Sequence, residues 1–183
     1  MWQRYWTDRG ADFRLLGVAQ EAHGPAPVAA LAAQYGVTFP VLVDETSLLG
    51  RVLGFRVVPS GCFVGLDRVI RYRHLDDFDI ADPRVRLNLE RFLAGEPCEA
   101  VDDVAPIDRA ALKLFAAGVA EQLAGRRVQA LDRWREALAL DPDNFVIRSQ
   151  IWVAEHPKRF YPVVDRNWQE LRLLEEGYDK PLP

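Results

Sequence analysis

The sequence has little cysteine and histidine, the residues that most often build disulfide frameworks and metal sites. Its two cysteines, Cys62 and Cys98, lie far apart and lack the paired spacing of a zinc ligand set. Its three histidines are also scattered along the chain. We therefore predict no metal and no other cofactor. A disulfide between the two cysteines requires the chain between them to fold back.

An excess of positive charge is also missing. The 183 residues carry 23 Lys and Arg against 27 Asp and Glu, which gives a net charge of -4 and a pI near 5.4. Nucleic-acid binding draws its affinity from clustered cations. This balance therefore argues against a nucleic-acid partner.

Long apolar runs and a signal peptide are absent as well. No stretch approaches the ~20 apolar residues of a membrane helix, and "MWQRYWTDRG" carries charges where a signal peptide has its apolar segment. The sequence as written predicts a soluble, cytoplasmic protein with no membrane partner, although a longer native form with a leader would overturn that assignment. Gly-rich phosphate loops and a Ser-His-Asp order are missing too, so we assign no catalytic residue.

Residues 1–94 alternate between helix and strand patterns. The expected elements are a helix over 2–10, a strand over 13–19, a helix over 28–35, an extended segment over 37–45, a helix over 47–53, strands over 61–66 and 68–74, and a helix over 83–94. Pro40 argues against a fully paired central strand, and Thr46 or Ser47 is the expected N-cap of the short helix. These elements predict an α/β domain.

The remaining chain is expected to be helical after an acidic, proline-containing linker over 95–107. Helices are predicted over 109–123, 126–140, 144–155 and 165–176, within a helical domain over 108–177 and before a tail over 178–183. Asp108 and Asp165 are the expected N-caps, and Gly125 separates the first two helices.

The order of the N-terminal elements resembles the redoxin branch of the thioredoxin-like fold, which includes peroxiredoxin-like and thiol-disulfide oxidoreductase domains. The matching stretches are "GVAQE" at 17–21, "GVTFPVLVDE" at 36–45, "LGFRVVPSGCFVGLDRVI" at 53–70 and the helix at 83–94. The resemblance implies an α/β thioredoxin-like fold, incomplete at its N-terminus. It also makes Pro59 the counterpart of the family's cis-proline.

The helical region resembles the tetratricopeptide repeat, a helix-turn-helix of roughly 34 residues. The matching positions are Gly118, Ala130, Trp134, Ala137 and Pro142, with a departure at Glu121, where the pattern has a large aromatic residue. The resemblance implies an all-α, tetratricopeptide-like region. Because fewer than ~3 repeats rarely stand alone, we expect it to dock on the α/β domain or on a partner.

In the resembled families, a central strand and a Cys-x-x-Cys motif precede the first helix, and neither is present in this sequence. That strand would lie between the strands at 13–19 and 61–66. The two strands could pair directly, or a partner chain could donate the strand, which predicts a dimer. The third alternative, which we favour as the origin, is that the sequence is a truncated reading of a longer protein.

Binding does not require the missing motif. In the resembled fold, the backbone of the residue before the cis-proline, here Val58, pairs with an extended substrate strand. Pro59, Trp2 and Trp6 would border that site, and we expect Phe55 to belong to the core.

The two cysteines are the candidate thiols, and neither is expected to be a nucleophile. Cys62 lies in a predicted strand with no flanking His or Lys, which favours a buried apolar role. Cys98 lies in the linker, where we expect it to be more exposed and where the acids of "EPCEA" would raise its pKa.

We therefore expect a non-catalytic protein that binds protein or peptide segments, through the cis-proline edge or through the helical tail. The alternative is a truncated thiol-disulfide oxidoreductase or peroxiredoxin-like enzyme whose redox cysteine or selenocysteine lies upstream of Met1. Strand donation between two copies would make the protein a homodimer.

Overall fold

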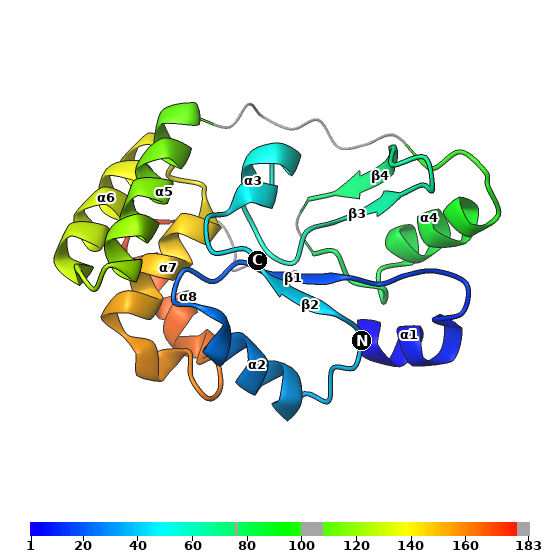
Figure 1. Cartoon of the computed structure of the whole chain (residues 1–183), viewed down its shortest axis with the longest axis horizontal. Coiled ribbons are helices and arrows are strands. Elements are labelled where there is room, and N and C mark those ends of the chain that lie inside the picture. Colours follow the sequence, from blue (N-terminus) through cyan, green and yellow to red (C-terminus); the bar gives the residue numbers. More distant parts are fainter. Residues whose placement is uncertain (76, 100–107, 179–183) are drawn as a thin grey trace.

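The computed structural model describes residues 1–75, 77–99 and 108–178. It is a mixed α/β structure, mostly helical within those residues (Figure 1). Its elements are α1 (Trp2–Arg9), β1 (Gly17–Ala19), α2 (Pro25–Gln34), β2 (Val41–Val43), α3 (Leu48–Leu53), β3 (Gly61–Val64), β4 (Ile70–His74), α4 (Pro83–Leu93), α5 (Arg109–Leu123), α6 (Arg127–Leu140), α7 (Phe145–Glu155), the 3-10 helix η1 (Pro157–Arg159) and α8 (Arg166–Glu175).

The four described strands form two separate sheets. β1 and β2 pair in parallel, and β3 and β4 form an antiparallel hairpin. Within the described residues β1 and β3 do not pair, so the direct pairing considered above is not found. β1 is also shorter than the expected strand over 13–19. Pro40 does not prevent pairing, because it precedes β2 and its carbonyl accepts a hydrogen bond from the Gly17 N–H at 2.9 Å.

Helix ends are fixed mainly by the expected side chains. Asp108 accepts hydrogen bonds from the backbone N–H groups of Ala110 and Ala111, and Asp165 accepts one from Trp168. The expected N-cap of α3 is confirmed in position only. Ser47 occupies the N-cap position without a capping bond, and the carboxylate of Asp44 accepts from the N–H groups of Leu48 and Leu49 at 2.7 and 2.8 Å.

Helices α5 and α6 pack closely around Trp134, which is fully buried. Gly118 makes this approach possible, because a Cβ atom there would lie 2.5 Å from the indole ring. The Trp134 Nε1–H donates a hydrogen bond to the Phe115 carbonyl at 3.2 Å. Ala130 and Ala137 are also fully buried, so the small residues noted in the sequence line the contact between the helices.

The described helices after residue 108 pack against the α/β region, as expected (Figure 1). The Gln150 side chain of α7 accepts from the Ala22 N–H at 2.9 Å and donates to the Gln20 carbonyl at 3.2 Å. The Val146 N–H, also on α7, donates to the Arg56 carbonyl at 3.0 Å. Helix α7 therefore contacts both the segment after β1 and the segment before β3.

The expected linker is described only as far as residue 99, and 100–107 lie outside the described residues. Its first part folds back on α4, where the Glu99 N–H donates to the Asn88 side chain at 2.7 Å. The expected tail is described only at Tyr178. The division of the chain into two domains stays a prediction.

Candidate functional site

The first candidate site is the turn between α3 and β3. The Val58–Pro59 peptide bond is cis, in agreement with the resemblance. Both residues are exposed, Val58 by 42%. The Pro59 carbonyl accepts a hydrogen bond from the Phe78 N–H at 2.9 Å, but no described residue bonds to the N–H or C=O of Val58. The turn is thus held at Arg56 and Pro59, and the peptide groups of Val58 are left open.

Open backbone groups are also found on β1 and β3. Gly17 donates to the Pro40 carbonyl, and the Ala19 carbonyl accepts from the Asp44 N–H at 2.8 Å. Because successive residues of a strand direct these groups to opposite sides, the N–H and C=O of Val18 point away from β2. Within the described residues β3 pairs only with β4, so alternate residues of β3 also direct their groups away from their partner strand.

The two open edges belong to different sheets. In Figure 1, β1 and β3 run in opposite directions. A single added strand could therefore run parallel to β1 and antiparallel to β3.

The two tryptophans predicted to border the site are both half-buried and differ in location. Trp2 stacks on Phe78 with 5.0 Å between ring centroids and donates its Nε1–H to the Phe78 carbonyl at 2.9 Å. Because the Phe78 N–H bonds to the Pro59 carbonyl, Phe78 alone links Trp2 to Pro59. Trp6 instead packs edge-on against Phe39, which precedes β2. Only Trp2 is brought to the turn, and Phe55 is buried as expected.

The two cysteines are free thiols, and both are half-buried. Burial raises the pKa of the Cys62 thiol, and the cation of Arg73 on the opposite strand only partly offsets this. Cys98 is less exposed than expected, because its segment folds back and its side chain packs against the core around α4. Burial also raises the pKa of Cys98, so the cause is desolvation rather than the neighbouring acids. Raised values leave little reactive thiolate at neutral pH.

A polar cluster that we did not predict from the sequence lies where the α/β region meets the helical region. Glu21 follows β1 and is 8% exposed. Its carboxylate accepts a hydrogen bond from the His23 N–H at 2.8 Å and lies 2.6 Å from His23 Nδ1. It also accepts one from the Tyr161 hydroxyl, 140 residues away in the sequence.

Hydrogen bonding determines the charge of this buried cluster. Burial acts to raise the pKa of Glu21, but the hydrogen bonds from His23 and Tyr161 outweigh it and lower the pKa below its ordinary value. The pKa of Tyr161 is raised, first by burial and then by the Glu21 carboxylate. Glu21 is therefore ionised and Tyr161 is neutral near pH 7. Polar residues directly after a strand, as in "AQEAHG", were the available sequence signal.

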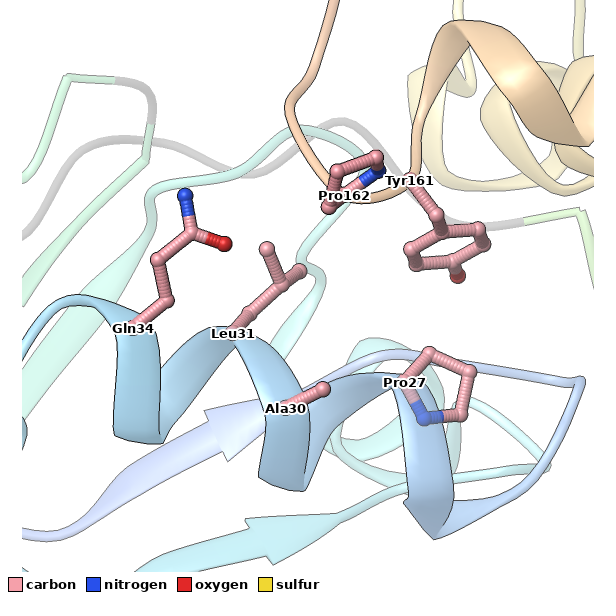
Figure 2. Close-up of a pocket in the computed structure, with 6 residues that line it drawn as sticks. All are labelled: Pro27, Ala30, Leu31, Gln34, Tyr161 and Pro162. Atoms are coloured by element: carbon pink, nitrogen blue, oxygen red, sulfur yellow. The ribbon is translucent and has the colours of Figure 1, made fainter.

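Two cavities meet at Tyr161. The larger, of about 370 Å³, is mainly apolar and lies between α2 and the Tyr161–Pro162 turn; Figure 2 shows Ala30, Leu31 and Gln34 on the α2 side. The smaller, of about 230 Å³, has a more polar lining that includes His23, Gln122, Arg127, Val153, Pro157 and Tyr161.

Two polar atoms at the smaller cavity lack a partner. His23 Nε2 and Gln122 Oε1 are buried and make no hydrogen bond to any described residue. A buried polar atom without a partner costs about 1–3 kcal/mol. Both atoms belong to residues that line the smaller cavity, but neither atom is itself exposed.

Comparison of the chain with family models, with curated proteins and with solved structures finds no match. In the described part of the chain, no three His, Cys, Asp or Glu residues gather as a metal ion would require. Over the same residues, no helix has the length and apolar character needed to cross a membrane. The class that the fold defines is a mixed α/β protein with a packed helical region, and its function is argued from the sites themselves.

Proposed function

We propose that this chain binds an extended segment of a protein partner through the backbone of Val58 and the open edges of β1 and β3. The observation that carries the proposal is the exposed, unbonded peptide group of Val58 beside a turn fixed by Arg56 and Pro59. Such a group is ready to pair without rearrangement of its neighbours, which reduces the entropic cost of binding.

Strand addition is the binding mode that fits these edges. In this mode main-chain hydrogen bonds supply affinity, and pockets for alternate side chains supply specificity. A segment antiparallel to β3 would place its alternate side chains on the same face as Phe63, which packs with Tyr72, Val85 and Leu89. We therefore propose a segment with apolar residues at every second position.

The finer fold assignment belongs to the same proposal. A thioredoxin-like α/β region is supported by the element order and by the position of β3 directly after the Val58–Pro59 turn. A tetratricopeptide-like helical region is supported by the Gly118 and Trp134 contact. In the resembled fold, the residue before the cis-proline pairs with extended substrates, which is the role proposed here for Val58.

We propose a non-catalytic role because the pKa values of both thiols are raised by burial. The alternative, an oxidoreductase whose redox residue lies upstream of Met1, stays a prediction. The two are separated by insulin-disulfide reduction and peroxide consumption, assayed for this chain beside a form extended to the previous in-frame start. Turnover by the extended form alone would favour the enzyme.

Binding is tested with a capped hexapeptide of alternating valine and threonine. The expected result is slower hydrogen exchange at the amides of Val18 and Val58 in the presence of the peptide. A hexapeptide N-methylated at alternate residues cannot make the same bonds, so it serves as the peptide control. If each amide exchanges at the same rate with the hexapeptide as with the N-methylated control, strand pairing is contradicted.

The matched variant is Val58→Pro, which removes the backbone donor. We expect its affinity for the hexapeptide to fall at least ~10-fold, the equivalent of about 1.4 kcal/mol. The control is Val128→Pro, in the first turn of α6, where the residue is 68% exposed and proline is tolerated. Unchanged affinity in Val58→Pro, with an intact fold, would show that Val58 does not pair.

A further inference from the structure

Arg56 joins the turn at Val58 to the helical region. It lies two residues before Val58 in the sequence. Its Nε–H donates to both carboxylate oxygens of Asp141 at 3.1 Å, and the two side chains are 19% and 8% exposed. Its backbone carbonyl accepts a hydrogen bond from the Val146 N–H at 3.0 Å. A single residue at the start of the turn is therefore bonded to the end of α6 and to the start of α7.

Both contacts of Arg56 match the charges found at helix ends. Asp141 directly follows α6, and the C-terminal end of a helix favours a cation such as the Arg56 guanidinium. Val146 lies in the first turn of α7, where backbone N–H groups have no partner within the helix. The Arg56 carbonyl supplies the acceptor for one of these groups. The connection between α6 and α7 thus presents a carboxylate and an N–H donor to the same residue.

The carboxylate that bonds to Arg56 is itself held in place. The Asn144 side chain, at the N-cap of α7, donates to Asp141 Oδ2 at 3.0 Å and accepts from the Ile147 N–H at 3.2 Å. Asp141 and Asn144 are both buried. A side chain that is locked by packing and by a neighbouring hydrogen bond can in turn orient the residue that bonds to it. Asp141 therefore restrains Arg56 relative to α7.

The residues next to Val58 are restrained as well. Val57 packs against the buried cluster of the helical region that contains Trp152. The Val57 carbonyl also accepts a hydrogen bond from the Ser60 hydroxyl at 2.8 Å. On the other side of Val58, the Pro59 carbonyl is bonded as described above. The exposed residue Val58 therefore lies between neighbours that are fixed on both sides.

We propose that Asp141 is a positioning residue for the strand-binding site at Val58. Through Arg56 it holds the peptide groups of Val58 in the conformation that an added strand requires. This inference rests on the proposed function and adds that the helical region controls the affinity of the site. Fixing the backbone of one free residue costs the equivalent of about 5- to 30-fold in affinity. A turn that is restrained before binding avoids part of that cost.

The test compares Asp141→Asn with the wild type. The substitution keeps the size of the side chain and removes its charge. We expect the affinity for the capped valine–threonine hexapeptide to fall about 5-fold. In the free chain, the ¹⁵N order parameter of the Val58 amide should decrease from the value of a rigid backbone, about 0.85. A general loss of stability would not lower the order parameter of this one residue in a chain that is still folded.

Glu155→Gln is the matched control. It removes the ion pair between Glu155 and Arg135, which lies within the helical region and does not contact the turn. We expect it to change neither the affinity for the hexapeptide nor the order parameter of Val58. Urea unfolding verifies that both variants are folded under the conditions of the binding measurement.

A double-mutant cycle with Arg56→Gln assigns the effect to the pair. If Asp141 acts through Arg56, Asp141→Asn should change the affinity little once Arg56 has been replaced. Arg56→Gln is also the test variant if Asp141→Asn folds poorly. A full effect of Asp141→Asn in the Arg56→Gln background would overturn the proposed route.

The positioning role and the proposed function fail in different ways. If the wild type does not bind the hexapeptide, the proposed function is wrong, and the order parameter of Val58 alone decides whether Asp141 restrains the turn. If the wild type binds and the folded Asp141→Asn variant binds equally well, only the positioning role is wrong. An order parameter that is the same in wild type and variant would also overturn that role.

Discussion

The hydrogen bond between Tyr161 and Glu21 offers a direct test of the buried cluster. Tyr161→Phe removes one hydroxyl and leaves the ring in place. The bond joins η1 and the following turn to the end of β1, so the variant affects the contact between the two regions of the chain. Tyr35→Phe is the matched control, since the Tyr35 side chain is 63% exposed.

The expected magnitude follows from the charge of the acceptor. A hydrogen bond to a charged group contributes about 1.5–3 kcal/mol to folding. Glu21 keeps its two bonds from His23 in the variant, so no larger loss is expected. We therefore expect Tyr161→Phe to lower the free energy of unfolding by about 1.5–3 kcal/mol at pH 7 and Tyr35→Phe to change it by less than about 0.5 kcal/mol.

The stability lost in Tyr161→Phe should become smaller as the pH falls. The pKa of Glu21 is lower in the folded chain than in the unfolded chain. Its ionised form therefore stabilises the fold above the unfolded pKa, and this contribution is lost as the pH falls through the folded pKa. Tyr161→Phe removes one of the bonds that lower the pKa. The difference in free energy of unfolding between wild type and Tyr161→Phe should therefore decrease below about pH 4.

Urea unfolding at a series of pH values measures these quantities. A double-mutant cycle with Glu21→Gln isolates the pair, because Tyr161→Phe should cost less when the carboxylate is absent. Equal losses for Tyr161→Phe and Tyr35→Phe at pH 7 would refute the reasoning. A difference that stays constant as the pH falls would refute the role of the charge.

Two further predictions concern α3 and the thiols. Asp44→Ala should lower the free energy of unfolding by about 0.5–2 kcal/mol, because two N–H groups of α3 lose their acceptor. Thr46→Ala should change the free energy of unfolding little, and urea unfolding measures both variants. Cys62 and Cys98 should react with a disulfide reagent more slowly than free cysteine at pH 8, because burial raises both pKa values; equal rates would contradict that cause.

Local signals in the sequence predicted the elements well. Asp108 and Asp165 cap their helices, and α4 begins at Pro83, because capping depends on residues two or three positions apart. At α3 the same local rule gave the correct N-cap position, Ser47, but not the side chain that makes the capping bonds. Asp44 lies three residues before the N-cap, outside the position from which a capping side chain usually bonds.

Contacts between distant segments could not be predicted in this way. The sequence places Glu21 and Tyr161 at opposite ends of the chain, and only the packing of α7 and η1 against the α/β region brings them together. Cys98 is a similar case. Its segment was expected to be an exposed linker, but the hydrogen bond from the Glu99 N–H to the Asn88 side chain turns it back toward α4.

Helix α7 contacts the segments next to both sheets. Gln150 holds the segment after β1, and Val146 holds the segment before Val58, so a single helix fixes the ends of both sheets. Val57 packs on the same helical region, in the cluster that contains Trp152. The segment that follows β1 and the segment that leads into β3 are therefore both anchored on one helix.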